Sequence, residues 1–139
     1  MTKPLIVITG ASSGIGAAIA REFSAAGHPL LLLARRHEYL KQLGLPNTLC
    51  RRVDVSDREA LSQAVDDAEL EYGPVDGFIN NAGCMLLGEL DTQQPSEWQR
   101  MFDINVIGVL NGIQSVLPSM KARKFGTIIN VSSRYGRAA

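Results

Sequence analysis

Residues 9–16 read Thr9-Gly10-Ala11-Ser12-Ser13-Gly14-Ile15-Gly16 and directly follow an apolar run at residues 5–9. Helical periodicity begins at Ile15, so the glycines form a turn between a strand and a helix. Glycine permits a tight turn and a close approach of the backbone to a ligand, and the helix N-terminus offers free N–H groups to an anion. The spacing G-x-x-x-G-x-G lacks the Lys-Ser/Thr pair of an ATPase phosphate loop. We expect the segment to cradle a pyrophosphate, although a plain tight turn would use the same residues.

Outward from this turn, short apolar runs alternate with stretches of helical periodicity. The expected strands are residues 5–9, 30–34, 48–53, 77–80 and 127–131. The expected helices are residues 15–26, 37–43, 57–72 and 96–123. The runs at 5–9, 30–34 and 127–131 are nearly all apolar, which suits strands buried on both faces. The alternation predicts an α/β fold with a parallel sheet, right-handed crossovers and helices on both faces.

Two helix starts have the capping-box pattern, in which a Ser side chain and an acidic or amide side chain three residues later satisfy free backbone N–H groups. These are Ser56-x-x-Glu59 and Ser96-x-x-Gln99. Gly108 and Gly112 lie four residues apart within the last expected helix, a spacing that favours close packing over ligand contact.

Composition excludes several classes of protein. At 139 residues and 45% hydrophobic, the chain predicts one domain with a substantial core. Fourteen basic and fourteen acidic residues leave no net charge and form no long run, so we expect neither nucleic acid nor a membrane as a partner. Cys50 and Cys84 form neither a disulfide framework nor a metal-ligand spacing, which predicts no metal site and a reducing, cytoplasmic location.

Five motifs occur in the order and spacing of the short-chain dehydrogenase/reductase family, which the sequence resembles over essentially its whole length. They are the glycine turn at residues 9–16, Asp54-Val55, Asn80-Asn81-Ala82-Gly83, Asn105-Val106 and Asn130-Val131-Ser132-Ser133. The resemblance implies a Rossmann-type doubly wound parallel sheet with strand order 3-2-1-4-5. It also implies an oxidoreductase that uses a nicotinamide dinucleotide.

The residues after the second expected strand favour NADP over NAD. An NAD site places Asp or Glu there to bind the ribose hydroxyls, whereas this chain has Ala34 followed by Arg35 and Arg36. Without the carboxylate nothing repels a 2′-phosphate, and a guanidinium matches phosphate oxygens. Two cations at a helix start also oppose the helix dipole, which a bound anion would offset. Solvated surface arginines are the alternative; for the phosphate we favour Arg35, with Ser13 assisting.

In the family, the aspartate after the third strand meets the adenine ring, and the Asn-Asn-Ala-Gly segment steadies the sheet and lines the cofactor pocket. The resemblance implies the first role for Asp54 with Val55 and the second for the segment that ends at Gly83. The expected cofactor-binding residues are therefore Gly10, Ser12, Ser13, Gly14, Ile15, Gly16, Arg35, Arg36, Asp54, Val55, Asn81, Ala82 and Gly83.

Two residues match catalytic positions of the family. Ser133 corresponds to the serine that polarises the carbonyl, and Asn105 corresponds to the asparagine that anchors a water relay to the catalytic lysine. Each has a plainer alternative, because a serine commonly ends a strand in a turn and a helical asparagine is commonly exposed or bonded locally.

The family's Tyr-x-x-x-Lys has no match in these 139 residues. Its tyrosine donates the proton and its lysine lowers the pKa of the tyrosine. At the lysine offset, the three tyrosines Tyr39, Tyr72 and Tyr135 are followed by Leu43, Asp76 and Ala139. We therefore expect residues 1–139 to form a single NADP-binding domain whose C-terminal part is missing, and we predict that this piece alone is inactive.

The expected function is an NADP-dependent oxidoreductase that interconverts an alcohol and a carbonyl by hydride transfer. The alternative is a non-catalytic NADP-binding module or an inactive fragment. The expected partners are a small-molecule alcohol or carbonyl substrate and, at full length, further copies of the chain in a dimer or tetramer. In such an oligomer, the resemblance implies that residues 96–123 contact a partner subunit.

Overall fold

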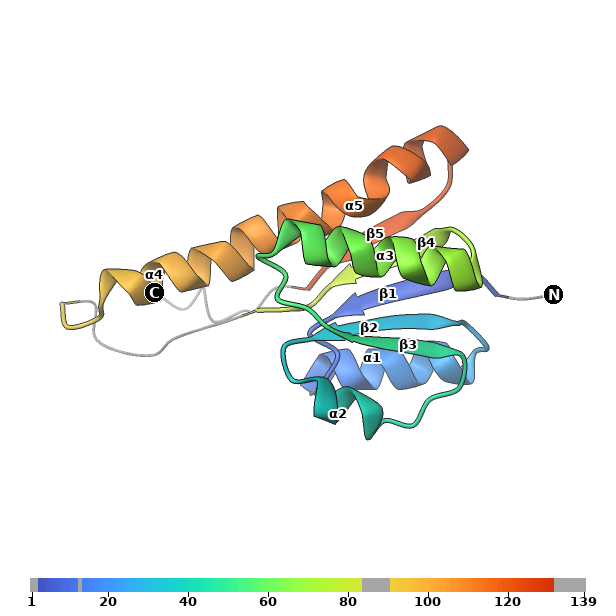
Figure 1. Cartoon of the computed structure of the whole chain (residues 1–139), viewed down its shortest axis with the longest axis horizontal. Coiled ribbons are helices and arrows are strands. Elements are labelled where there is room, and N and C mark those ends of the chain that lie inside the picture. The colour runs from blue at the N-terminus through green and yellow to red at the C-terminus, as the bar shows by residue number, and fades with distance from the viewer. Residues whose placement is uncertain (1–2, 13, 84–90, 132–139) are drawn as a thin grey trace.

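The structure is a computed structural model that describes residues 3–12, 14–83 and 91–131. One five-stranded sheet of order β3-β2-β1-β4-β5 forms its centre, and every strand pairing is parallel (Figure 1). The strands are β1 (Leu5–Thr9), β2 (Leu30–Ala34), β3 (Thr48–Arg52), β4 (Val75–Asn80) and β5 (Thr127–Asn130). This order confirms the predicted Rossmann-type α/β fold.

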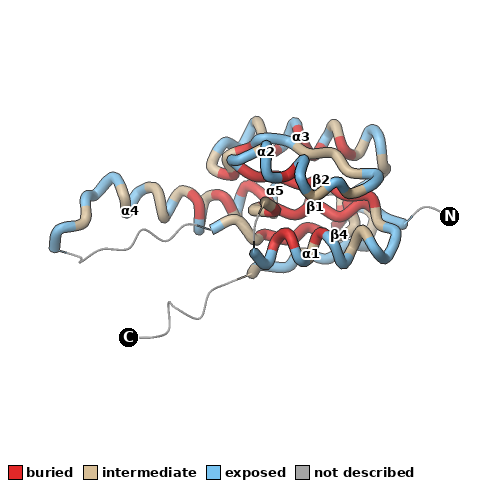
Figure 2. Tube along the Cα trace, turned by 90° about the horizontal axis from the view of Figure 1, so that it is seen from below, coloured by how far each residue is buried: buried red, intermediate tan, exposed pale blue. Residues whose placement is uncertain are grey.

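Helices cover both faces of the sheet. In Figure 1, α1 (Gly14–Ala25) and α2 (His37–Lys41) lie on one side and α3 (Arg58–Tyr72) and α5 (Gly108–Arg123) on the other. Alternate residues of the central strands serve the two sides: Leu5 and Val7 pack in the α3 and α5 core, and Ile6 and Ile8 pack in the α1 and α2 core. Figure 2 shows the resulting band of buried residues along the sheet. The apolar runs of β1 and β2 are fully buried, as predicted.

β5 is the exception to the predicted burial of apolar runs. Three of its four residues are exposed, and the Ile129 side chain is 47% accessible. The strand pairs with β4 on one side and is an edge of the five-stranded sheet, so within the described residues no strand covers its other side. The apolar composition of residues 127–131 correctly predicted a strand, but it did not indicate that the strand would lie at an edge of the described sheet.

The helix predicted at residues 96–123 consists of three pieces. They are α4 (Pro95–Phe102), a π-helical segment η1 (Asp103–Ile107) and α5. A π-helical turn inserts an extra residue and shifts the side chains that follow it around the helix axis. In Figures 1 and 2, α4 extends beyond the sheet while α5 packs on it.

The glycines of α5 allow this packing. A Cβ on Gly108 would lie 2.5 Å from Val55 Cγ2, and a Cβ on Gly112 would lie 2.5 Å from Asn80 Oδ1 and 2.8 Å from Phe78 Cε1. Real Cβ atoms do not approach that closely, so only glycine lets the helix lie at this distance. The packing role predicted for the pair is confirmed.

Both predicted capping boxes are wrong by one or two residues. The N-cap of α3 is Asp57, whose side chain accepts from the Ala60 N–H at 3.1 Å, while the Ser56 hydroxyl donates to Asp54 instead. The N-cap of α4 is Gln94, and Pro95 follows as its first residue. Proline has no N–H to satisfy at that position, so this helix begins without a serine cap.

Within the described residues, no helix is long and apolar enough to cross a bilayer.

Candidate functional site

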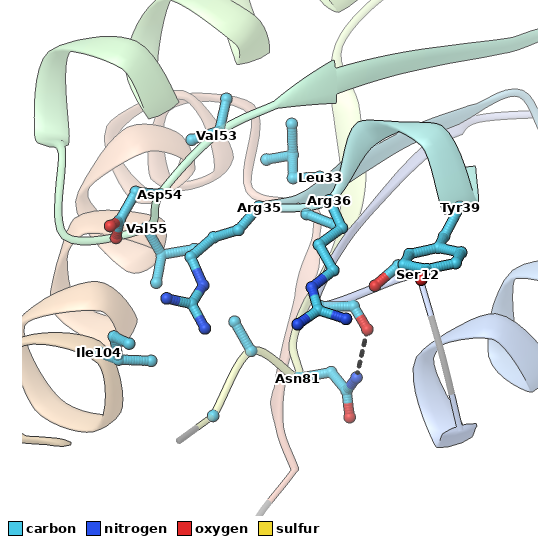
Figure 3. Close-up of a pocket in the computed structure, with 14 residues that line it drawn as sticks. Ser12, Leu33, Arg35, Arg36, Tyr39, Val53, Asp54, Val55, Asn81 and Ile104 are labelled. Carbon is cyan, nitrogen blue, oxygen red and sulfur yellow. Dashed lines mark hydrogen bonds between the residues drawn. The ribbon is translucent and has the colours of Figure 1, made fainter. Parts of the chain in front are cut away.

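A cleft of about 490 Å³ opens at the carboxyl ends of β1 to β4 (Figure 3). The strand order reverses there, between β1 and β4, and open α/β sheets bind ligands at such a switch point. The loops after the four strands supply most of the lining, and α2 and η1 complete it. The lining residues are Gly10, Ser12, Leu33, Ala34, Arg35, Arg36, Tyr39, Val53, Asp54, Val55, Asn81, Ala82, Gly83 and Ile104.

Nine of the thirteen expected cofactor residues lie in this lining. Gly14, Ile15 and Gly16 do not, and Ser13 lies outside the described residues. The Ile15 side chain is 61% exposed on the first turn of α1. Of the glycine turn, Gly10 and Ser12 therefore line the cleft, whereas the last three residues belong to α1.

The glycines of the turn have separate structural roles. A Cβ on Gly16 would overlap the carbonyl oxygen of Gly10, and a Cβ on Gly10 would lie 2.8 Å from Ala82 Cα, so both are needed for packing. Gly14 has a left-handed φ of 57°, and a Cβ there would meet no atom within 4 Å. The first turn of α1 contains no acidic residue. A Cβ on Gly14 would therefore project into open space, and the first turn of α1 carries no negative charge that would repel an anion.

Thr9 joins the glycine turn to the end of β4. Its buried hydroxyl oxygen accepts from the backbone N–H groups of Asn81 and Ala82, each at 3.0 Å. The Asn81 side-chain amide in turn donates to the Gly10 carbonyl at 3.0 Å, the dashed line in Figure 3. These bonds hold the two loops at a constant separation. The sequence reasoning gave Thr9 no role, although it is the first residue of the glycine motif.

The next loop along the sheet is held by a pair of asparagines. Asn80 Nδ2 donates to Asn130 Oδ1 at 3.0 Å, which joins the ends of β4 and β5. Ser133 lies just beyond β5 and outside the described residues. Asn105 lies in η1, and its Oδ1 is 3.6 Å from the position that a Cβ on Gly83 would take. The structure therefore brings Asn105 to the edge of the cleft, against the Asn-Asn-Ala-Gly loop.

Arg35 and Arg36 both follow β2 and reach into the cleft from its upper edge in Figure 3. Both residues are exposed. Among the described residues, neither guanidinium has a hydrogen-bond or ion-pair partner. The Arg36 Cζ instead lies 5.9 Å from the centroid of the Tyr39 ring. Two unpaired cations in one cleft favour an anionic ligand. Tyr39 was not among the expected residues.

The Asp54 carboxylate is engaged by protein groups. Its Oδ1 accepts from the Ser56 N–H at 3.0 Å and from the Ser56 hydroxyl at 2.7 Å, and its Oδ2 forms an ion pair with Arg100 at 2.8 Å. Partial burial alone would raise the pKa of Asp54, but the bonds from Ser56 and Arg100 outweigh it and lower the pKa. The carboxylate is therefore ionised and links β3 to α4.

Val55 lies beside Asp54 and contributes to the cleft wall. The buried Asn111 side chain on α5 donates to the Val55 carbonyl at 2.9 Å. Sequence reasoning missed Asn111 and Arg100 as positioning groups, because each acts across more than 40 positions of the chain. Within the described residues, no three His, Cys, Asp or Glu side chains are grouped closely enough to hold a metal ion.

Residues of the glycine turn, of Asp54-Val55 and of Asn80-Asn81-Ala82-Gly83 line one cleft, and the model of the short chain dehydrogenase family matches residues 4–139. The chain belongs to this family. An oxidoreductase of Listeria monocytogenes is 43% identical over 97% of the chain, and the chain spans 57% of that relative.

Solved structures of family members have the same fold. A short-chain dehydrogenase from Streptomyces avermitilis superimposes with a TM-score of 0.90 at 34% identity, over 99% of this chain and 52% of the other. A metagenomic short-chain oxidoreductase solved in complex with NADP has a TM-score of 0.86 at 33% identity, over 95% and 62%. The chain thus spans little more than half the length of the relatives it matches.

Proposed function

We propose that this chain forms the cofactor-binding part of an NADP-dependent oxidoreductase that interconverts an alcohol and a carbonyl. The observation that carries the proposal is the pair Arg35 and Arg36 at the end of β2, where Ala34 stands in place of an acidic residue. A carboxylate at that strand end selects NAD, whereas guanidinium groups suit the 2′-phosphate of NADP.

The rest of the cleft fits the remainder of a dinucleotide. Beside the cleft, a Cβ on Gly14 would meet no atom within 4 Å, which leaves room at the start of α1 for a pyrophosphate to accept from backbone N–H groups. Val53 and Val55 offer an apolar wall beyond the arginines, which suits the adenine ring. Because the Asp54 carboxylate is already paired with Ser56 and Arg100, we propose that these bonds hold the segment that carries Val55 in place. The metagenomic relative, which was solved with NADP, supports the same choice of cofactor.

NADP supplies or accepts the hydride when it is bound. We propose that Ser133 donates a hydrogen bond to the substrate oxygen and so stabilises the negative charge that develops there. Asn105, beside Gly83 at the cleft edge, is proposed to hold a water that relays the proton. No Tyr-x-x-x-Lys pair occurs in the 139 residues, so the proton donor is proposed to come from outside them.

The domain organisation, the location and the oligomeric state of the protein are predictions. We propose that residues 1–139 belong to one nucleotide-binding domain whose further elements complete the substrate site. A cytoplasmic location and a homo-oligomer are predictions of the same kind. The alternative is a protein that binds NADP without catalysing hydride transfer.

Cofactor titration tests the proposal on the protein expressed from its own gene. NADP and NAD are titrated separately, and we expect the tighter binding for NADP. Arg35→Ala removes a charge-assisted bond of about 1.5–3 kcal/mol. NADP binding should therefore weaken about 10- to 150-fold while NAD binding changes little. Arg21→Ala, an exposed arginine of α1 outside the cleft, is the matched control.

Equal losses for the two cofactors in Arg35→Ala would contradict the phosphate assignment. NADPH oxidation in the presence of a panel of aldehydes and ketones then separates the two functions. Turnover supports the oxidoreductase, whereas tight NADP binding without turnover of any carbonyl favours the binding protein.

A further inference from the structure

Tyr39 is a cleft residue with no motif behind it. It lies in α2, a helix of five residues, next to Leu40, which is buried against the sheet. This anchor fixes the backbone of Tyr39, and the Tyr39 N–H donates to the Arg36 carbonyl at 3.3 Å. The Tyr39 ring is 42% exposed and lines the cleft at the same end as Arg36. In Figure 3 the ring lies beside the Arg36 guanidinium, on the side of the cleft that holds Ser12.

The contact between the Tyr39 ring and Arg36 bears on the entropy that an arginine side chain loses when it binds a phosphate. A free arginine side chain has about 2 kcal/mol of rotamer entropy, much of which is lost when it binds a phosphate. Among the described residues, the Arg36 guanidinium has no hydrogen bond or ion pair to hold it, and its cation–π contact is with Tyr39. The face of an aromatic ring attracts a guanidinium within about 6 Å. The ring therefore restricts Arg36 before any ligand arrives.

We propose that Tyr39 is a positioning residue for cofactor choice: its ring holds the Arg36 guanidinium toward the 2′-phosphate of NADP. The inference rests on the proposed function, since it requires that NADP be the preferred cofactor. Arg35 enters the cleft on the side of Ile104 and Arg36 on the side of Tyr39 (Figure 3). The two guanidinium groups thus approach the cleft from different positions, and only Arg36 has an aromatic support.

A double-mutant cycle tests the role. Tyr39→Leu removes the ring, Tyr39→Phe keeps it and removes the hydroxyl, and Arg36→Ala removes its partner. Kd values for NADP and NAD are measured for each variant and for Tyr39→Leu in the Arg36→Ala background. Titration with 2′,5′-ADP and 5′-AMP isolates the phosphate, and thermal unfolding checks that each variant is folded.

We expect Tyr39→Leu to weaken the binding of NADP and 2′,5′-ADP about 2- to 5-fold, which corresponds to the about 0.5–1 kcal/mol of a cation–π contact at an exposed site. NAD and 5′-AMP should change less than about twofold because they lack the group that Arg36 binds. Tyr39→Phe should resemble the wild type. In the Arg36→Ala background, Tyr39→Leu should add no further loss, because its effect passes through Arg36.

Four results would overturn the role of Tyr39. Equal losses of NAD and NADP would indicate a contact with the adenine or a structural effect. Additive losses in the double variant would separate Tyr39 from Arg36, and a Tyr39→Phe loss as large as that of Tyr39→Leu would assign the effect to the hydroxyl. A wild-type protein that prefers NADP but is insensitive to Tyr39→Leu refutes only this inference. A wild-type protein that prefers NAD refutes the proposed cofactor as well.

Discussion

Replacing Gly112 by alanine should destabilise the protein, although alanine is the better helix former. The new Cβ would lie 2.5 Å from Asn80 Oδ1 and 2.8 Å from Phe78 Cε1. Both neighbours are buried, so neither can move into solvent. Either α5 must move away from β4 or the Asn80 side chain must rotate and break its 3.0 Å hydrogen bond to Asn130.

The magnitude follows from three opposing effects. Alanine gains about 1 kcal/mol over glycine inside a helix. Overpacking of a filled core costs about 1–3 kcal/mol, and a buried amide left without its partner costs about another 1–3 kcal/mol. If both costs apply, Gly112→Ala should lower the free energy of unfolding by about 1–5 kcal/mol.

Urea unfolding followed by circular dichroism measures this change. Gly83→Ala is the matched control, because a Cβ there would have its nearest neighbour, Asn105 Oδ1, at an ordinary 3.6 Å. The control should lose less than about 1 kcal/mol. A Gly112→Ala protein as stable as the wild type, or more stable, would refute the packing argument and show that α5 can shift at little cost.

Two further perturbations test the cleft. Gly14→Val should abolish binding of NADP and NAD alike, because it fills the open space before α1, and unchanged affinity in a folded variant would show that the glycine is only structural. The lowered pKa of Asp54 stabilises the folded state above the unfolded carboxyl pKa, near 3.9, and this contribution is lost as the pH falls through the folded value. Asp54→Asn should therefore lower the free energy of unfolding by about 0.5–1 kcal/mol at pH 7. Between about pH 5 and 3 the variant should lose less stability than the wild type. Urea unfolding measures both, and a variant that loses as much stability as the wild type across that range would contradict the role of Asp54.

The fold could be predicted because its determinants are local in the sequence. Apolar runs of strand length, separated by helical periodicity, mark β1 and β2 without any knowledge of their neighbours. The burial of β5 could not be inferred in this way, since burial depends on which strands lie alongside. The π-helical segment η1 was also missed. It shifts the buried face of the helix, but exposed apolar residues such as Val106 and Leu110 hide that shift in the sequence pattern.

The candidate site could be predicted where a motif supplies both a residue and its place on the sheet. Gly10, Arg35 and Asn81 follow successive strands, so parallel topology brings them to one edge. Arg100, Asn111 and Tyr39 carry no such signal. Their roles arise from contacts with Asp54, Val55 and Arg36, and from sequence alone each is an ordinary polar helix residue.

Cleft shape and core packing are linked through α5. Gly108 lets the helix approach Val55, and Asn111, one turn further along, donates to the Val55 carbonyl. Gly112 then lets the same helix approach Asn80, which lies next to Asn81 and the glycine turn. A change that pushes α5 outward would therefore displace two walls of the cleft at once. Weakened cofactor binding at Gly108 or Gly112 should accompany lost stability. Changes at Arg35, Arg36 or Tyr39, which precede or belong to α2 on the other face of the sheet from α5, should alter cofactor choice alone.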